Sequence, residues 1–215
     1  MRLASVDDLR SIYRPPGRGP VDKVIDRLDN HCRDFIAKSP FFVLSTASAD
    51  GVCDGSPKGG PPGFVRVLDD RRLAWADFSG NNRLDSFQNL VTNDCVALLF
   101  LIPGLDETLR VNGTAELRTD RELCDEFAVG DKPARVVVVV TAAEAYIHCA
   151  KALRRAELWS PDIWLQPEDL PSAACIVKDH ASIDADLAAI EDARAENLRA
   201  TLWEPGGADR RPGRD

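Results

Sequence analysis

The sequence lacks the long apolar segment that a membrane-spanning helix needs, and its first 20 residues lack the apolar core of a signal peptide. It also lacks a surplus of positive charge, because 35 acidic residues outnumber 27 basic ones and the net charge is −8. A general nucleic-acid binder needs clustered Lys and Arg to neutralise phosphates. These absences favour a cytoplasmic protein with neither a membrane nor a nucleic-acid partner.

Paired cysteine motifs are absent as well. The six cysteines are widely spaced along the chain, with no CxxC pair among them. This spacing disfavours a zinc site or a disulfide framework, and we predict no metal site. We expect reduced cysteines that are mostly buried as small hydrophobic side chains.

The residues that are present suit one globular domain with terminal extensions. The 215 residues are 44% hydrophobic and 29% charged, as in ordinary soluble proteins. We predict an N-terminal helical segment at 1–40, a central domain at 41–160, and a helical extension with a tail at 161–215. Helical spacing of apolar residues predicts helices at 5–12, 21–37 and 183–203, whereas 204–215 is expected to fray.

The central part has the pattern of short strands joined by tight turns, which favours an antiparallel barrel over a parallel sheet. Five consecutive valines suit a strand that is buried on both faces. The predicted fold class is therefore mainly β (α+β), a six- to seven-stranded antiparallel barrel with flanking helices. The expected strands are 41–47, 52–58, 64–68, 72–76, 95–102, 108–117 and 136–140, and the expected helices are 82–90, 120–127 and 142–159.

Two arginines are candidate ligands for a phosphate. Arg66 alternates with Val65 and Val67 along its strand and is either a surface residue or a phosphate clamp. Arg83 follows Asn82 at the expected start of a helix, where a cation is unfavourable unless an anion binds there. The alternative for Arg83 is a solvated side chain.

Three further groups are weaker candidates. The segment Ser56-Pro57-Lys58-Gly59-Gly60 ends a strand and on its own reads as an ordinary loop. Trp75 is expected in the core or against a bound ring, Asp77 as a cap or a ligand of a hydroxyl group, and Ser86 as a minor contact one helical turn beyond Asn82.

The segment after the valines carries a possible site face. His148, Lys151, Arg155 and Trp159 are spaced at helical intervals and would share one side of a helix. His148 is either a proton donor or an ordinary hydrogen-bonded or exposed side chain. The other two histidines, His31 and His180, are expected at the surface.

Four strings occur in order along the middle of the chain. They are KSPFFVLSTASADG (38–51), SPKGGPPGFVRVLDD (56–70), WADFSGNNRLDSFQNL (75–90) and LLFLIPGLDETLRVNG (98–113). Together they closely resemble the pyridoxamine-phosphate-oxidase-like, FMN-binding split β-barrel family, with the nearest match in its bacterial "probable FMN-dependent enzyme" branch.

This resemblance implies a split β-barrel, FMN as cofactor and a homodimer with the cofactor at its interface. It implies that Arg66, Asn82 and Arg83 hold the phosphate and that the 56–58 segment lies along the flavin ring. Residues around Lys151 would reach the site from the second subunit. The implied cofactor-binding residues are Ser56, Pro57, Lys58, Val65, Arg66, Asp77, Asn82, Arg83, Ser86, Lys151 and Trp159.

The implied function is an FMN-dependent oxidoreductase that acts on a small organic substrate, without an obligatory acid or base from the protein. The pyridoxamine phosphate oxidases proper end in an Arg-x-His clamp, whereas no histidine follows His180 here. Oxidation of pyridoxamine phosphate itself is therefore not expected. The alternatives are a deazaflavin (F420)-dependent reductase of the same fold, a non-catalytic flavin- or haem-binding protein, and an acidic scaffold without a cofactor.

Overall fold

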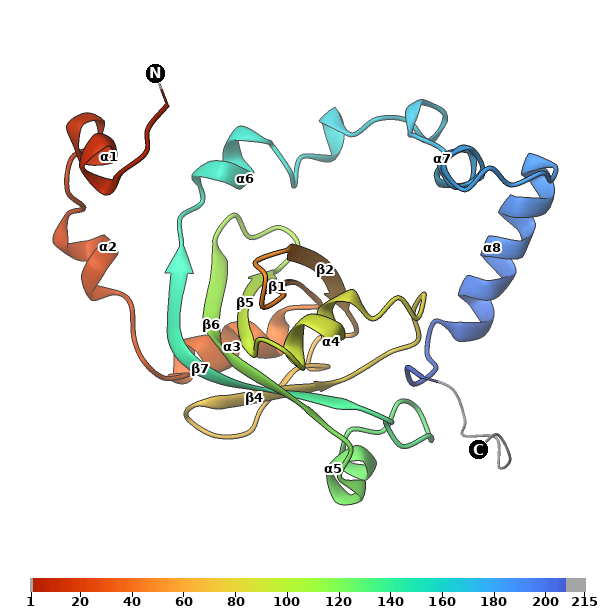
Figure 1. Cartoon of the computed structure of the whole chain (residues 1–215), viewed down its shortest axis with the longest axis horizontal. Helices are drawn as coiled ribbons and strands as arrows, with labels where there is room; N and C mark the ends of the chain where they lie inside the picture. Colours follow the sequence, from red (N-terminus) through yellow and green to blue (C-terminus); the bar gives the residue numbers. More distant parts are fainter. Residues whose placement is uncertain (1, 208–215) are drawn as a thin grey trace.

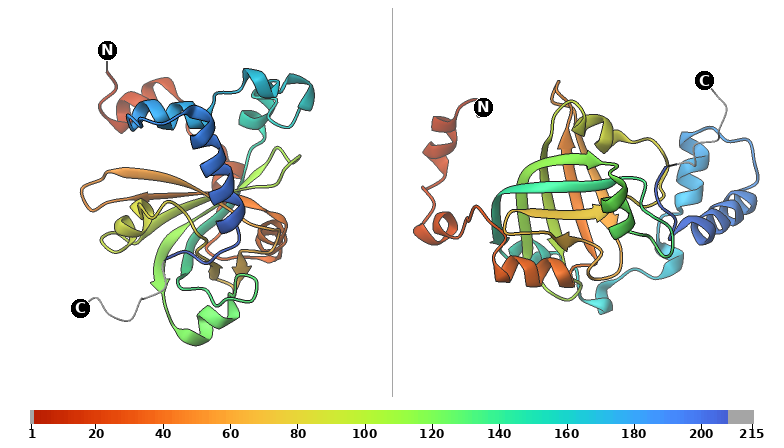
Figure 2. Two further views of the ribbon diagram at one scale, coloured as in Figure 1. Left: turned by 90° about the vertical axis from the view of Figure 1, so that its right-hand side faces the viewer. Right: turned by 90° about the horizontal axis from the view of Figure 1, so that it is seen from below.

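The computed structural model describes residues 2–207 of the chain (Figure 1). Seven antiparallel strands form one sheet in the order β2-β1-β5-β6-β7-β4-β3, which confirms the predicted fold class. Figure 2 shows how the sheet curls on itself. The strands are β1 Phe41–Ala47, β2 Cys53–Gly59, β3 Arg66–Val67, β4 Arg72–Ala76, β5 Cys95–Leu101, β6 Thr108–Arg118 and β7 Val137–His148.

The helices lie around this sheet and along both ends of the chain. Those next to the sheet are α3 Asn30–Lys38, α4 Asp85–Leu90 and α5 Arg121–Glu126. The terminal ones are α1 Val6–Ile12, α2 Arg18–Asp22, α6 Lys151–Arg155, η1 Pro161–Ile163, η2 Pro167–Asp169, α7 Ala173–His180 and α8 Leu187–Thr201. Among the described helices, none is long and apolar enough to cross a membrane.

Alternating apolar residues on the strands produce one continuous core. Phe42, Leu44, Leu98 and Phe100 are fully buried inside the curled sheet. The helix α3 adds Ile36 and its neighbours to this core, since its buried residues lie on one helical face. The valines at the start of β7 are buried on both faces of the sheet, as the sequence predicts.

The single helix predicted at 21–37 is wrong. Within 21–37 the chain is helical only at the end of α2 and in α3. Between them, Ile25 bridges Ala145 of β7 through two backbone hydrogen bonds of 2.7 and 3.1 Å. Asp29 then caps α3 by accepting a hydrogen bond from the backbone N–H of Cys32. Sheet pairing therefore overrides the helical periodicity of this segment.

The helix predicted at 142–159 is also wrong in its first half. Strand β7 continues to His148 and pairs with β6 along its whole length, with an irregularity at Asn112/Gly113. His148 is thus a strand residue, and only the short α6 follows it. The predicted helical face that joins His148 to Lys151, Arg155 and Trp159 does not exist, although His31 and His180 are exposed as expected.

The cysteines differ from expectation in their burial. Cys32 and Cys124 are buried, but the other four are exposed, and none of the six forms a disulfide. Burial raises the pKa of the Cys32 thiol to about 11, and the neighbouring Asp29 adds to this shift. This thiol is therefore an inert packing group in the core.

Candidate functional site

A cleft of about 760 Å³ opens where β2, the segment after β4 and the end of the chain meet. It continues into a smaller hollow beside α4, because both hollows share residues of β2 and of the 77–81 segment. We call the whole space the cleft, the part beside α4 its inner end and the part near Trp203 its outer end. The cleft residues that the sequence predicts for a site are Ser56, Pro57, Lys58, Asp77, Asn82 and Ser86.

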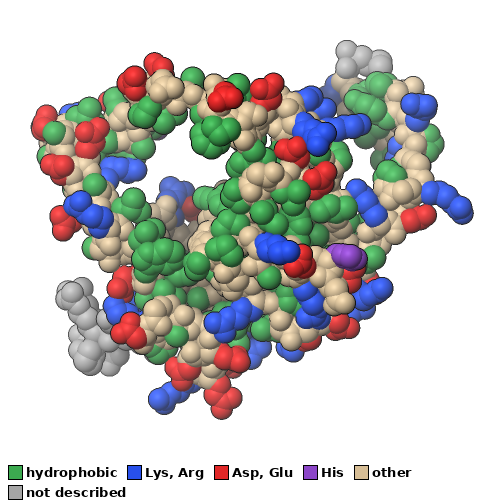
Figure 3. Space-filling view, turned by 180° about the vertical axis from the view of Figure 1, so that it is seen from behind, with side chains coloured by type: hydrophobic (Ala, Val, Ile, Leu, Met, Phe, Trp, Pro, Cys, Tyr) green, Lys and Arg blue, Asp and Glu red, His purple; other side chains and the backbone are tan. Residues whose placement is uncertain are grey.

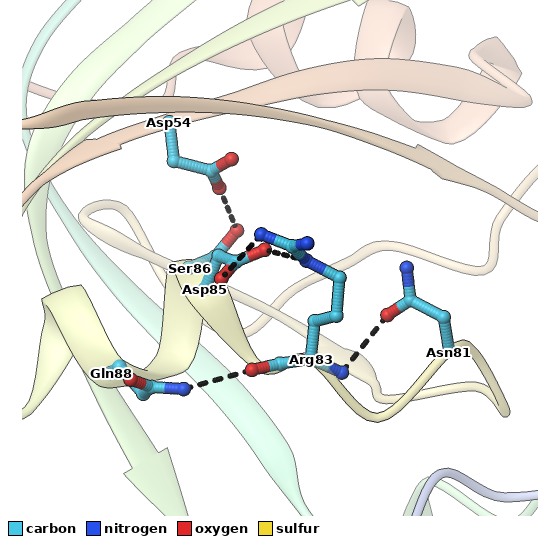
Figure 4. A network of polar contacts seen from close by, with 6 residues as sticks. All are labelled: Asp54, Asn81, Arg83, Asp85, Ser86 and Gln88. Carbon is cyan, nitrogen blue, oxygen red and sulfur yellow. Dashed lines mark hydrogen bonds and ion pairs between the residues drawn. The ribbon is translucent and has the colours of Figure 1, made fainter. Parts of the chain in front are cut away.

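Polar contacts fix the inner end of the cleft (Figure 4). The Ser86 hydroxyl donates to Asp54 at 2.6 Å, so the start of α4 is tied to β2. The Arg83 guanidinium lies 2.8 Å from an oxygen of Asp85 and its side chain is 72% exposed. Arg83 itself lines neither hollow, although its neighbours Asn82 and Leu84 line the inner end, and its guanidinium is paired with a carboxylate that competes with an incoming anion.

The backbone at the inner end adopts an unusual conformation. Asn82 and Leu84 have positive φ values of 57° and 61°. Left-handed backbone is unfavourable for leucine, and such strain tends to gather at functional sites. The helix expected from residue 82 onwards begins only at Asp85, after Leu84. The side chain of Asn81 instead accepts a 3.0 Å hydrogen bond from the backbone N–H of Arg83.

Two opposite charges lie in the middle of the cleft. Burial raises the pKa of Asp77, and the nearby Lys58 partly offsets this effect. The ammonium group of Lys58 lies 5.8 Å from the ring centroid of Phe87. Lys58 is thus a cation held beside an aromatic ring and a partly buried carboxylate, with its charge directed at the space that a ligand would fill.

Trp75 forms part of the cleft wall and leaves one polar group unsatisfied. The side chain is 1% exposed, and its indole Nε1 has no hydrogen-bond acceptor among the described residues. A buried donor without an acceptor costs about 1–3 kcal/mol. An acceptor on a ligand in the cleft would remove this cost.

Of the remaining predicted site residues, Arg66 lines an adjoining hollow that shares Phe64, Phe78 and Trp203 with the cleft, and the others lie away from it. Val65 is buried in the core. Arg66 donates to the backbone oxygen of Glu126 at 2.9 Å and stacks over Phe127, so its guanidinium lies on the α5 side. Lys151 is exposed on α6, and Trp159 donates to the backbone oxygen of Leu105. Within one chain, the structure does not bring Arg66 and Arg83 together.

The end of the chain contributes a wall that the sequence reasoning missed. Residues 202–207, the C-terminal strap, lie against the segment after β4. The backbone N–H of Ser79 donates to Glu204 at 2.8 Å, and that of Gly206 donates to Asp77 at 2.9 Å. Residues 204–207 are therefore held rather than frayed, and 208–215 lie outside the described residues. The Gly- and Pro-rich composition concealed this role, and the apolar pair Leu202-Trp203 was its only signal.

The strap is also fixed from its other side. Lys132 pairs with Glu204 at 2.6 Å, and Arg135 donates to the backbone oxygen of Gly207. A Cβ atom on Gly206 would lie 2.0 Å from an oxygen of Asp77, so a larger residue would require the Asp77 side chain or the strap to shift. Two segments far apart in the sequence thus form one rigid side of the cleft.

His148 has a distinct environment at the end of β7. Burial lowers its pKa, and the charges of Arg110 and Lys23 lower it further. It does not line the cleft of its own chain. A role for His148 in the same site would have to come from another subunit.

Comparison with solved structures gives similarities at low identity. HupZ of Group A Streptococcus has a TM-score of 0.45 and 19% identity, and the match covers 55% of this chain and 92% of HupZ. A putative pyridoxamine 5'-phosphate oxidase from Lactobacillus delbrueckii has a TM-score of 0.45 and 22% identity, with coverage of 57% and 95%. An FMN-binding protein from Syntrophomonas wolfei has a TM-score of 0.39 and 16% identity, with coverage of 54% and 83%.

Sequence comparison is more decisive at the level of the family. No curated protein matches the chain over its sequence. In contrast, the family profile described as pyridoxamine 5'-phosphate oxidase matches residues 28–149, which is more than half of the chain and includes every strand of the sheet. The chain therefore belongs to the pyridoxamine 5'-phosphate oxidase family.

Proposed function

We propose that the chain binds FMN in the cleft and acts as an FMN-dependent oxidoreductase on a small organic substrate. The observation that carries this proposal is the convergence of Ser56, Lys58, Asp77, Asn82 and Ser86 from three separate segments on one cleft. The larger of its two hollows has a volume of about 760 Å³, which lies in the ordinary range for small-molecule sites. Family membership supports the same reading.

The residues of the cleft fit the chemical parts of FMN. The unpaired Trp75 Nε1 and the hydroxyl of Ser56 offer hydrogen bonds to polar atoms of a flavin. Bound FMN would supply the electron-transfer chemistry, and Lys58 would balance negative charge on the reduced ring. We propose Arg83 with the neighbouring Asn82 as the phosphate site, because Arg83 is the exposed cation beside the inner end.

The acidic surroundings of Arg83 set a condition on phosphate binding. Asp54 and Asp85 line the inner end, and both repel a dianion. The Asp85 carboxylate accepts from the Arg83 Nε and Nη2 atoms at 2.8 and 3.4 Å, so it competes with a phosphate for this guanidinium. The two residues should therefore have opposite effects on FMN affinity.

We expect Arg83→Ala to weaken FMN binding by about one to two orders of magnitude, since charge-assisted contacts contribute roughly 1.5–3 kcal/mol. Asp85→Asn should strengthen FMN binding by releasing Arg83 and removing a repulsive charge. Neither change should alter riboflavin binding, because riboflavin has no phosphate. Titration of both ligands by flavin fluorescence measures these effects.

Arg121→Ala is the matched control, because this arginine is 95% exposed on α5 and does not line the cleft. Equal losses for FMN and riboflavin in Arg83→Ala would place the phosphate elsewhere. Unchanged binding of both ligands would do the same.

A further inference from the structure

The outer end of the cleft has an aromatic wall. The ring centroids of Phe64 and Phe78 are 6.5 Å apart, and those of Phe78 and Trp203 are 6.1 Å apart in an edge-to-face arrangement. All three residues line the outer end. Rings at these separations attract one another and present flat apolar faces to a ligand.

The aromatic wall is held in place, yet its last member is open. The backbone on either side of Phe78 is hydrogen-bonded to the strap, and Phe78 itself bridges Pro205. Trp203 nevertheless remains 56% exposed. A large apolar ring on a fixed backbone loses little freedom when a ligand covers it, which favours binding.

The polar groups of the outer end restrict what such a ligand can be. Among the described residues that line it, only Lys58 and Asp77 carry charge, and these two charges offset each other. The outer end thus carries no net charge of its own, and a phosphate there would face the Asp77 carboxylate. The Arg66 guanidinium lies in the adjoining hollow, where it stacks over Phe127 and donates to Glu126.

We propose that the outer end of the cleft binds the substrate, and that this substrate is a flat, uncharged aromatic molecule, packed against Trp203 of the C-terminal strap. This inference rests on the proposed function, in which the phosphate of FMN lies at the inner end and its ring lies beside Lys58. Trp203 is then a specificity-determining residue, because it covers the ring of the substrate. The same wall discriminates against phosphorylated aromatic compounds.

A matched pair of probes tests this inference on the FMN-saturated protein. We expect 1-naphthol to bind measurably by calorimetry, and 1-naphthyl phosphate to bind at least tenfold more weakly. Trp203→Ala should weaken 1-naphthol binding by about tenfold through the loss of aromatic contact. The control Trp164→Ala should leave it unchanged, since Trp164 is 55% exposed on the same C-terminal segment but does not line the cleft.

A second variant moves the strap, and Trp203 with it, without changing any side chain of the aromatic wall. Gly206→Ala places a Cβ atom against Asp77 and should displace residues 202–207, so 1-naphthol binding should again weaken. FMN affinity, measured in parallel, should stay within about twofold of wild type for Trp203→Ala, since the inner end is intact.

The outcomes separate this inference from the proposed function. Wild-type protein that binds no FMN overturns the proposed function. Wild-type protein that binds FMN, but binds 1-naphthol equally well with and without Trp203, overturns the inference. Tighter binding of 1-naphthyl phosphate than of 1-naphthol also overturns it.

Discussion

Asp77 is the residue that links the cleft most closely to the stability of the fold. Its backbone carbonyl accepts from the strap at Gly206, and its backbone N–H donates to Val136. Its side chain is shielded from water next to Lys58, and burial holds its pKa above the ordinary range. A carboxylate in this position destabilises the folded chain, but it can interact with a ligand or a neighbouring cation.

The raised pKa of Asp77 predicts the direction of a pH effect. The folded-state pKa of Asp77 exceeds its unfolded value of about 3.9. The free energy of unfolding therefore falls as the pH rises from the unfolded to the folded pKa, and this loss of stability persists at neutral pH. Asp77→Asn should therefore have a higher Tm than wild type at pH 7. The advantage should disappear at about pH 3, where the Asp77 carboxyl is protonated in both the folded and the unfolded protein.

Thermal unfolding of ligand-free protein at several pH values measures this effect. Asp50→Asn is the control, because Asp50 is exposed in the turn between β1 and β2. A lower Tm for Asp77→Asn at pH 7, or a difference that does not depend on pH, would contradict the assignment.

The structure brings together those predicted site residues whose position one local segment determines. Ser56, Lys58 and Asn82 lie on the cleft because strand endings and tight turns fix them. Phe78 and Trp203 were missed because their proximity depends on contacts between segments more than a hundred residues apart. No local pattern predicts such a contact.

At the scale of elements, the β6–β7 pair is the longest ladder of the fold. It extends from the Arg118/Val137 pair to the Thr108/His148 pair and changes register at Gly113. A Cβ atom at Gly113 would lie 1.9 Å from the backbone oxygen of Thr141. Only glycine allows β7 to approach β6 this closely at the irregularity.

We therefore expect Gly113→Ala to reduce the free energy of unfolding by about 1–3 kcal/mol, as overpacking does in other cores. Gly55→Ala in β2 is the matched control, since a Cβ atom there meets nothing within 4 Å. Denaturant unfolding of both variants measures the difference. Equal stabilities would mean that the ladder relaxes around the extra methyl group.

The helices and strands also show which sequence patterns predict structure correctly and which do not. The strands 41–47 and 72–76 were predicted with their observed bounds, because turn signals flank them on both sides. The alanine-rich 142–145 segment has high helix propensity, yet it is strand, because β6 and Ile25 offer backbone partners on both edges. The helix propensity of a local segment contains no information about such distant backbone partners.

At the scale of the whole molecule, the helices near the two ends of the chain extend away from the barrel, whereas the C-terminal strap returns to it (Figure 1). The helices α1, α2, α6 and α8 contain no buried residue. Figure 3 shows an opening between the C-terminal segment and the body of the molecule. Exposed apolar side chains are concentrated on these ends, at Val6, Ile12 and Tyr13 on one and at Trp164 and Leu165 on the other.

We propose that a second copy of the chain covers these apolar residues in a two-fold homodimer. Light scattering at micromolar concentration should then give twice the chain mass of 23.6 kDa. A monomer mass under these conditions would contradict the proposal. The dimer would also give Arg66, Lys151 and Trp159 a way to approach the cleft of the partner.

Cofactor binding by the wild-type protein tests the central claim most directly. Purified protein is mixed with excess FMN and desalted, and its visible spectrum is recorded with riboflavin as the parallel ligand. We predict the visible bands of oxidised flavin at one FMN per chain, with less riboflavin retained because it lacks the phosphate. A colourless protein after desalting, together with unquenched flavin fluorescence in a titration, would contradict the claim.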